Sequence, residues 1–163
     1  VRSLADAECL CHVDGVERNL LAGSVRPIVL LRRRAAGNDA HIPNALELAP
    51  SVAHDLPKLG VMLPYTPLQH LLLAAAAAHG MSALVMTSGN LSEEPIETDD
   101  ALLGHLVAAG IADALLGNDR AILSRYDDSV VRVVDGVVMP VRRARGYAPQ
   151  PLSLPAPRQR HAL

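Results

Sequence analysis

Residues 60–86 read GVMLPYTPLQHLLLAAAAAHGMSALVM, and this stretch decides the fold. Val61–Leu63 and Leu84–Met86 are two short apolar runs that predict strands. Between them, Pro67–His79 predicts a helix, because a proline stands at its start and Gly80 follows its end. A strand, a helix and a strand joined by short links predict a βαβ unit, whose strands run parallel with a right-handed crossover.

The residues before this stretch predict two short helices and a strand. Ser3-Leu-Ala-Asp6 is typical of a capping box with Asp as its acidic member, and it opens a helix that we expect to run through Cys11. Asp14–Leu21 predicts a second helix. Pro27–Leu31 is apolar and β-branched, which predicts a buried strand. Residues 35–49 lack periodicity and contain Gly, Asn and Pro, so they predict a loop.

The residues after the stretch change from helical to strand patterns. Thr98–Ala109 predicts a helix with acids in its first turn, where they suit the helix dipole. Residues 114–116 and 121–123 predict short strands, and Asp135-Gly136 between two apolar runs is a strong hairpin signal. The chain is therefore expected to be α/β. We expect one mixed sheet with helices packed on it, the strands lying near 27–32, 60–63, 84–87, 129–134 and 137–142, and the helices near 67–79 and 98–109.

The composition fits one globular domain and argues against several classes of binding protein. The chain has 163 residues, of which 50% are hydrophobic, and a net charge of −2. No overall positive field therefore attracts nucleic acid or an acidic membrane. Three tyrosines are the only aromatic residues, too few for the stacking platforms that bind single-stranded nucleic acid. No signal peptide or membrane-spanning apolar run is visible, so we expect a cytoplasmic protein with no membrane partner.

The best candidate for chemistry is Thr87–Pro95, which reads TSGNLSEEP and follows a predicted strand. Ligands of open α/β sheets bind beyond the carboxyl ends of strands. Ser88 and Gly89 are small enough to let backbone N–H groups approach an anion closely. Asn90 can donate and accept at once, which suits a purine edge, a ribose hydroxyl or a carbamoyl group. An ordinary turn is the alternative, because Ser, Gly and Asn are also turn residues.

Two further candidates lie near the hairpin. Arg143 and Arg145 follow its last strand, and arginines there can clamp a phosphate or carboxylate bidentately. Asp127 and Asp128 could hold magnesium together with water, and Ser129 comes directly after them. The alternatives are a charged strand end in solvent and a turn with a strand-starting serine.

No arrangement of a catalytic nucleophile stands out, so the catalytic residues stay unassigned. Ser88 lacks the Gly-x-Ser-x-Gly elbow, and no P-loop sequence is present. Cys9, Cys11 and His12 fall in one short predicted helix without a partner cluster. We therefore expect them to be packing residues, and we expect no metal ligands in this chain.

Several of these segments together resemble one family. Met86–Pro95 resembles the Thr-Ser-Ala/Gly-Asn-x-Ser-x-x-Pro segment of YrdC-like domains. Gly60–Leu73 resembles the strand and helix that precede this segment in YrdC-like domains, and its sequence is typical of HypF-type carbamoyltransferases. The sequences of Arg125–Val131 and Arg142–Pro149 also resemble the motifs of HypF proteins. The resemblance runs over nearly the whole chain from about Arg26.

The resemblance implies a fold, a reaction and a site. The fold is a YrdC-like twisted mixed β-sheet with flanking helices. The reaction forms carbamoyl-adenylate from carbamoyl phosphate and ATP. A following domain then passes the carbamoyl group to the C-terminal cysteine of a HypE-like acceptor protein, in nickel–iron hydrogenase maturation. ATP is thus a substrate, Mg²⁺ is a candidate cofactor, and zinc is expected only in an upstream segment. The residues expected to bind the nucleotide or carbamoyl-adenylate are Ser88, Gly89, Asn90, Ser129, Arg143 and Arg145.

Departures from the family pattern indicate a fragment. A Lys/Arg-rich phosphate-binding segment, an acylphosphatase-like domain and a zinc-binding segment are expected upstream of Val1. We expect a YrdC-like adenylate-binding domain over residues 1–150. Residues 151–163 are expected to be a Pro-rich linker and the start of a carbamoyl-transfer domain. By itself the fragment is expected to be inactive and poorly soluble, because a missing N-terminal strand would leave a sheet edge unpaired.

Three alternatives to this function stay open. The first is a threonylcarbamoyl-adenylate synthase, an enzyme of the same fold that acts in tRNA modification. The Ser-Gly-Asn and Arg-Ala-Arg-Gly-Tyr motifs disfavour this alternative. An antibiotic O-carbamoyltransferase shares the architecture. A double-stranded RNA-binding YrdC-like module is the third, and the net charge of −2 weighs against it.

Overall fold

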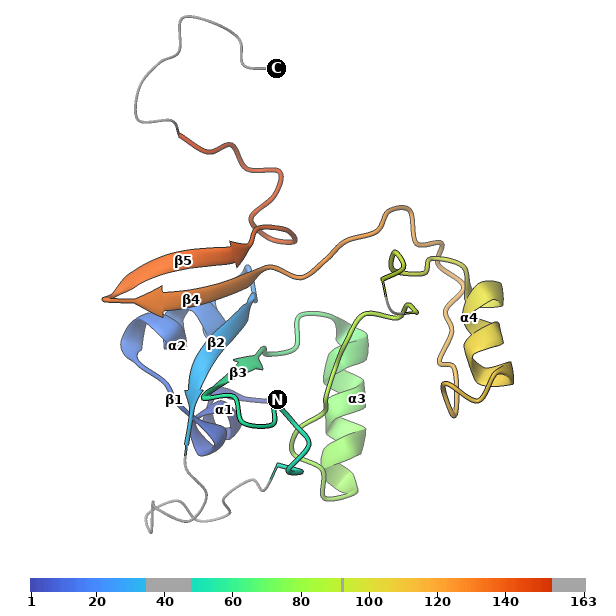
Figure 1. The fold of residues 1–163 in the computed structure, drawn as a ribbon, viewed down its shortest axis with the longest axis horizontal. Coiled ribbons are helices and arrows are strands. Elements are labelled where there is room, and N and C mark those ends of the chain that lie inside the picture. The colour runs from blue at the N-terminus through green and yellow to red at the C-terminus, as the bar shows by residue number, and fades with distance from the viewer. Residues whose placement is uncertain (35–47, 92, 154–163) are drawn as a thin grey trace, which may run out of the picture.

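The computed structural model describes residues 1–34, 48–91 and 93–153 (Figure 1). Most of the loop expected over 35–49, and most of the expected 151–163 segment, lie outside these ranges. The elements in chain order are α1 (Leu4–Leu10), β1 (Cys11–His12), α2 (Gly15–Ala22), β2 (Ile28–Arg33), β3 (Lys58–Val61), α3 (Pro67–Ala78), α4 (Asp100–Ala108), β4 (Val130–Val134) and β5 (Val137–Arg142).

The five strands form one mixed sheet with β2 at its centre. Along one side β2 pairs antiparallel with β3, with Val29 opposite Val61. Along its other side it pairs parallel with β4, with Val29 opposite Val131, and antiparallel with the short β1. The expected α/β fold with a mixed sheet is confirmed.

Helices α1 and α2 form because each begins with a capping box. The Ser3 side chain accepts from the backbone of Asp6, whose carboxylate accepts from the backbone of Ser3. Asp14 and Glu17 make the same reciprocal pair at α2. Each box satisfies two backbone donors that a helix start leaves free. Both predicted helices are confirmed, although α1 is one residue shorter than expected.

Cys11 and His12 form strand β1 rather than the end of a helix. The helix stops at Leu10, whose carbonyl accepts from the backbone N–H of Arg34 at 3.0 Å. Cys11 then pairs with Arg33 on β2. The pairing with β2 is a long-range contact that the local helical pattern could not indicate. Cys11 is buried in the core, and its burial raises the pKa of its thiol to about 11.

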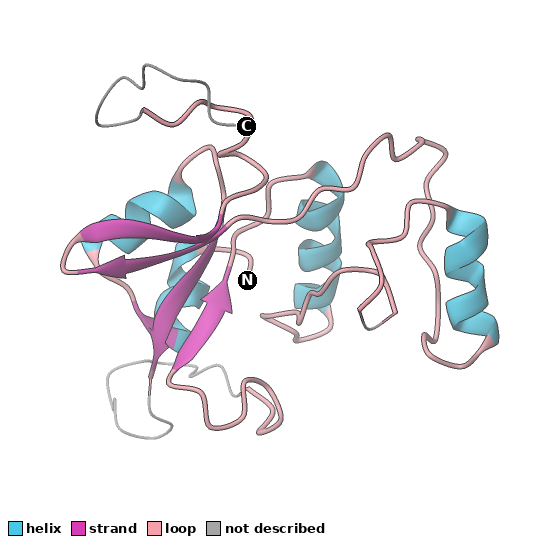
Figure 2. Cartoon of the chain, turned by 45° about the horizontal axis from the view of Figure 1, so that its top comes forward, coloured by secondary structure: helices cyan, strands magenta, loops and turns pink. Residues whose placement is uncertain are grey.

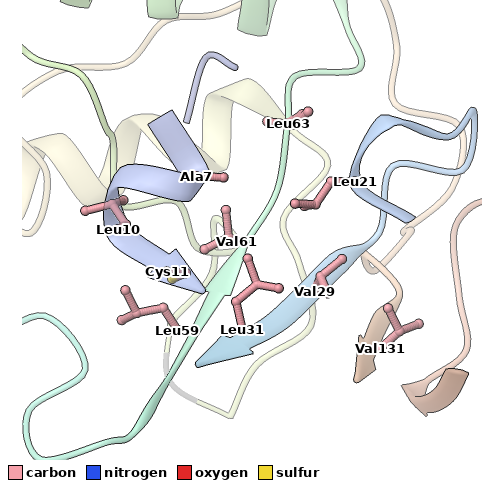
Figure 3. Close-up of a cluster of buried hydrophobic side chains, with 10 residues drawn as sticks. All are labelled: Ala7, Leu10, Cys11, Leu21, Val29, Leu31, Leu59, Val61, Leu63 and Val131. Atoms are coloured by element: carbon pink, nitrogen blue, oxygen red, sulfur yellow. The ribbon is translucent and has the colours of Figure 1, made fainter. Parts of the chain in front are cut away.

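The core lies between helices α1 and α2 and one face of the sheet. Burying apolar side chains there supplies the main stabilising free energy, about 25 cal/mol per Å² removed from water. Figure 3 shows these side chains, which come from both helices, from β1, β2, β3 and β4, and from the segment after β3; they are Ala7, Leu10, Cys11, Leu21, Val29, Leu31, Leu59, Val61, Leu63 and Val131.

The predicted βαβ unit is wrong. Helix α3 forms as expected, with Thr66 and Gln69 as its capping box. However, residues 81–88 belong to no strand, and neither do 114–116 or 121–123. An apolar run becomes a strand only where another main chain pairs with it, and the described residues offer these segments no such partner.

Helices α3 and α4 stand beside the sheet instead of covering it (Figures 1 and 2). Helix α4 buries none of its residues, and α3 buries only Leu73 and Ala76. A cavity of about 780 Å³ lies among β3, α3 and residues 80–86. The expectation that the helices near 67–79 and 98–109 pack on the sheet is therefore wrong for both. None of the helices in the described part of the chain combines the length and the apolar character that a bilayer crossing requires.

The predicted hairpin is confirmed. Strands β4 and β5 pair antiparallel, with Val134 opposite Val137. Asp135 and Gly136 connect them with φ values of 50° and 77°. Two consecutive residues with positive φ give the turn whose twist matches that of the flanking strands, and Asp-Gly is a preferred pair for it.

The unpaired extended segments predict self-association of this chain. Val85 is 77% exposed and Leu123 94% exposed, and neither residue lies in a strand. Exposed apolar segments with free main-chain groups template pairing with other chains. We therefore expect light scattering to detect oligomers, and fewer of them in the double variant Val85→Lys, Leu123→Lys.

The control for this prediction is the double variant Leu56→Lys, Leu68→Lys. It adds the same charge at other exposed positions, and it should associate as the parent chain does. A parent chain that stays monomeric at high concentration would contradict the prediction.

Candidate functional site

Four chain segments meet at one edge of the sheet, and six charged side chains lie on them. Strands β2 and β4 are parallel, so both begin at this edge, with Ile28 opposite Val130. Strands β3 and β5 run against them, so both end there, with Arg142 opposite Val130. Figure 1 shows the start of β4 and the arrowhead of β5 beside the start of β2. We call this group the strand-end cluster; its members are Arg26, Tyr65, Asp127, Asp128, Ser129, Arg142, Arg143, Arg145 and Tyr147.

Arg145 lies at the centre of the strand-end cluster. Its Nε donates to Asp128 Oδ1 at 2.7 Å. Its Nη1 and Nη2 donate to the carbonyls of Val25 and Arg26 at 3.0 and 2.8 Å. Its guanidinium carbon lies 3.5 Å from the centroid of the Tyr65 ring, within the range of a cation–π contact. Arg145 thus connects the segments that precede β2 and β4 with the one that follows β3.

Ser129 is fully buried beneath this arrangement. Its Oγ donates to the carbonyl of Arg145 at 2.9 Å and accepts from the backbone N–H of Ala144 at 2.8 Å. A buried hydroxyl needs such partners, because an unpaired one costs about 1–3 kcal/mol. The hydroxyl therefore joins the start of β4 to the segment after β5.

Arg143 and Arg142 flank this buried part. Arg143 Nη2 donates to the carbonyl of Tyr147 at 2.7 Å and also to that of Gln150, so it closes its own loop. Arg142 is about half exposed; its Nε donates to the carbonyl of Asp128 at 2.7 Å, and its Nη1 lies 3.6 Å from Asp127 Oδ1. Both guanidinium groups thus use part of their donor capacity and keep the rest.

The balance of charge in the strand-end cluster suits an anion. The cluster contains four guanidinium groups and two carboxylates, of which Arg142 and Arg145 pair with Asp127 and Asp128, and Tyr65 adds a neutral hydroxyl. Burial, followed by the charge of Asp128, raises the pKa of Tyr65, so the phenol stays protonated. It donates to Asp128 Oδ1 at 3.3 Å. The excess of guanidinium groups favours a phosphate or a carboxylate as ligand.

The two aspartates do not fit a magnesium site. Asp128 is paired with Arg145 and Asp127 lies near Arg142, so cations of the protein already compensate both carboxylates. Within residues 1–34, 48–91 and 93–153, no three His, Cys, Asp or Glu side chains come together in a way that could hold a metal ion.

Ser88, Gly89 and Asn90 lie elsewhere. Both views place their segment between α3 and α4, apart from the sheet (Figures 1 and 2). Asn90 Nδ2 donates to the carbonyls of Leu91 and Glu94 at 2.7 and 3.0 Å, which closes the loop. Its Oδ1 is buried and has no hydrogen-bond partner in the described structure. That oxygen is free to accept a bond from a donor of a ligand.

Of the residues expected to bind the adenylate, the structure thus brings together Ser129, Arg143 and Arg145. It does not bring Ser88, Gly89 or Asn90 to them. The expectation that both groups follow buried strands is wrong for each of them, because β5, which precedes Arg143 and Arg145, is mostly exposed, and residues 84–87 are not a strand. Tyr65 was not expected in the site at all. Its signal in the sequence was a tyrosine two residues after the apolar run at 61–63.

The family comparison covers most of the chain. Residues 1–144 match the Sua5/YciO/YrdC family, which is described as "telomere recombination". The HypF carbamoyltransferase of Rhodobacter capsulatus is 49% identical over 157 residues, covering 93% of this chain and 18% of that protein. That of Synechocystis is 43% identical over 152 residues, covering 92% and 18%. The chain spans about a fifth of the length of such relatives.

Two solved structures have the same fold. Full-length HypF in its phosphate- and nucleotide-bound form superimposes with a TM-score of 0.76 and 40% identity, covering 93% of this chain and 22% of that one. HypF of T. kodakarensis superimposes with the same TM-score and 31% identity, covering 95% and 19%. The fold is therefore that of a YrdC-like segment within HypF proteins.

Proposed function

Since the chain belongs to the Sua5/YciO/YrdC family, we propose that it is the nucleotide-binding part of a HypF-type carbamoyltransferase. The observation that carries this proposal is the 39–49% identity to four HypF proteins over nearly the whole chain. The solved relative described as nucleotide-bound supports ATP as a substrate. Residues 1–150 would be the YrdC-like domain, and 151–163 a linker to a carbamoyl-transfer domain.

The proposed reaction forms carbamoyl-adenylate. Hydrolysis of carbamoyl phosphate leaves carbamate, whose oxygen attacks the α-phosphorus of ATP. The bond from that phosphorus to the oxygen bridging to the β-phosphate breaks, and pyrophosphate leaves. This chemistry needs positioning and charge stabilisation, with little covalent work from the protein. The carbamoyl group would then pass to the C-terminal cysteine of a HypE-like acceptor.

The arginine-rich strand-end cluster is the proposed place for the phosphate. Arg143 is the proposed clamp, because only the guanidinium fork matches two phosphate oxygens at once. It would exchange its bonds to the carbonyls of its own loop for bonds to the ligand. Ser129 and Arg145 complete this part of the site. Ser88, Gly89 and Asn90 would reach the ligand from the other side after the loop moves, with Asn90 Oδ1 accepting from the carbamoyl amide.

A chimera tests the function. In the HypF of Rhodobacter capsulatus, the aligned segment is replaced by the present chain, and exchange of pyrophosphate into ATP is measured. We expect exchange that depends on carbamoyl phosphate, because formation of the adenylate is reversible. The unmodified relative is the control for the assay.

Bicarbonate plus threonine is the competing substrate pair, and it distinguishes a threonylcarbamoyl-adenylate synthase. Exchange that requires this pair, or a folded chimera without any exchange, would contradict the proposal.

A further inference from the structure

We propose that Arg145 is a positioning residue: Tyr65 and Asp128 hold it, and it holds Ser129 and Arg143 in place for the ligand. The inference rests on the proposed function for the identity of the ligand, a nucleotide. It departs from the simpler idea that both arginines after β5 contact the phosphate.

The side chain of Arg145 has little capacity left for a ligand. All three of its nitrogens donate to protein oxygens, on Asp128, Val25 and Arg26. The Tyr65 ring covers one face of its guanidinium group. The side chain is only 22% exposed. Three of its five N–H groups are thus used, and the Tyr65 ring and the low exposure of the side chain limit the access of a phosphate to the other two.

The main chain of Arg145 connects this anchored side chain to the strand-end cluster. Its backbone N–H donates to the carbonyl of Asp127 at 3.1 Å, and its own carbonyl accepts from Ser129 Oγ. The neighbouring Ala144 donates its N–H to the same hydroxyl. Fixing the Arg145 side chain therefore fixes the backbone from Ala144 to Gly146 against the start of β4.

Arg143 differs from Arg145 in the partners of its side chain. Its bonds go to carbonyls four and seven residues later in its own loop, not to other segments of the sheet edge. This group can reorient without breaking the connection among β2, β3 and β4. Arg143 can therefore turn toward a ligand, whereas Arg145 holds the segments of the site in position.

Amide hydrogen exchange on the present chain tests this division without any ligand. In Tyr65→Leu and in Arg145→Lys, we expect the amides of Ala144 and Arg145 to exchange at least about tenfold faster, because the anchor is lost. The amide of Leu31, in the middle of β2, should keep its rate. The matched control is Tyr126→Leu, which removes an exposed tyrosine outside the strand-end cluster.

Unchanged exchange at Ala144 and Arg145 would overturn the proposal. If Tyr65→Leu does not fold, Tyr65→Phe is the second variant. It keeps the ring over Arg145 and loses only the bond to Asp128, so its exchange should lie between those of the parent and Arg145→Lys.

Nucleotide binding to the chimera separates positioning from direct contact. We expect Tyr65→Leu and Arg145→Lys each to raise the Kd for ATP about tenfold or more, and the double variant to add little to either. Direct contact predicts a different pattern: Arg145→Lys raises the Kd because lysine lacks the guanidinium fork, but Tyr65→Leu changes it little because it removes no ligand contact. A chimera that does not bind ATP would refute the proposed function, while the exchange rates would still decide the role of Arg145.

Discussion

Replacing Gly146 with alanine should lower the free energy of unfolding by about 3 kcal/mol, the sum of backbone strain and overpacking. Gly146 has a φ of +86°, a conformation that residues with a Cβ rarely adopt. A Cβ built there would lie 2.6 Å from Val25 Cγ1 and 3.0 Å from the Val25 carbonyl oxygen. The backbone after β5 could not stay against the segment before β2. Chemical denaturation of the present chain measures the loss.

Gly136 provides the matched control for this substitution. Its φ is +77°, but a Cβ would meet nothing within 4 Å. Gly136→Ala should therefore cost only the strain, about 1 kcal/mol. The difference between the two variants measures how closely Gly146 approaches Val25. Equal costs would contradict the packing of this turn.

Replacing Leu31 with alanine should lower the free energy of unfolding by about 2–5 kcal/mol. Leu31 lies in the central strand β2 and is 0% exposed. It packs within the cluster that joins helices α1 and α2 to the sheet (Figure 3). Its removal loses the transfer free energy of the side chain and leaves a cavity between strand and helices.

Leu123 is the control for the core substitution. The same change, Leu123→Ala, is made at a side chain that is 94% exposed, and it should alter stability by less than about 0.5 kcal/mol. Thermal unfolding of both variants is the measurement. A Leu31→Ala variant as stable as Leu123→Ala would show that the sheet and the two N-terminal helices do not form one core.

Local signals in the sequence predicted the local structure well. The capping residues at Ser3 and Asp14 predicted α1 and α2, and Asp135-Gly136 predicted the β4–β5 hairpin. In each case the residues that form the structure are neighbours in the chain. Capping boxes and tight turns involve only three or four consecutive residues, so all the interacting residues can be recognised in one short segment of sequence.

Long-range pairing could not be read in the same way. The apolar run at 84–86 looks like that at 29–31, but only the second has partners on both sides in the described structure. β1 is the opposite case, since Cys11 became a strand residue through its pairing with Arg33. Strand formation depends on the partner as much as on the residues themselves.

The candidate site was predicted only in part for a related reason. The sequence indicated Ser129, Arg143 and Arg145 as candidate residues, but it did not show from local patterns that they lie together. Their common location follows from the parallel pairing of β2 with β4 and the hairpin of β4 with β5. The part played by Tyr65 depends on the antiparallel pairing of β3 with β2, which the predicted βαβ unit did not contain.

The central claim is that the strand-end cluster binds the nucleotide through Arg143. The most direct test is carbamoyl phosphate-dependent exchange of pyrophosphate into ATP by the chimera carrying Arg143→Ala. We expect at least about a tenfold loss, because a charge-assisted hydrogen bond to the phosphate contributes about 1.5–3 kcal/mol. Arg132→Ala, on the exposed middle of β4, should leave the rate unchanged, and Ser88→Ala should cost less than Arg143→Ala. Near-normal exchange by a folded Arg143→Ala chimera would contradict the claim.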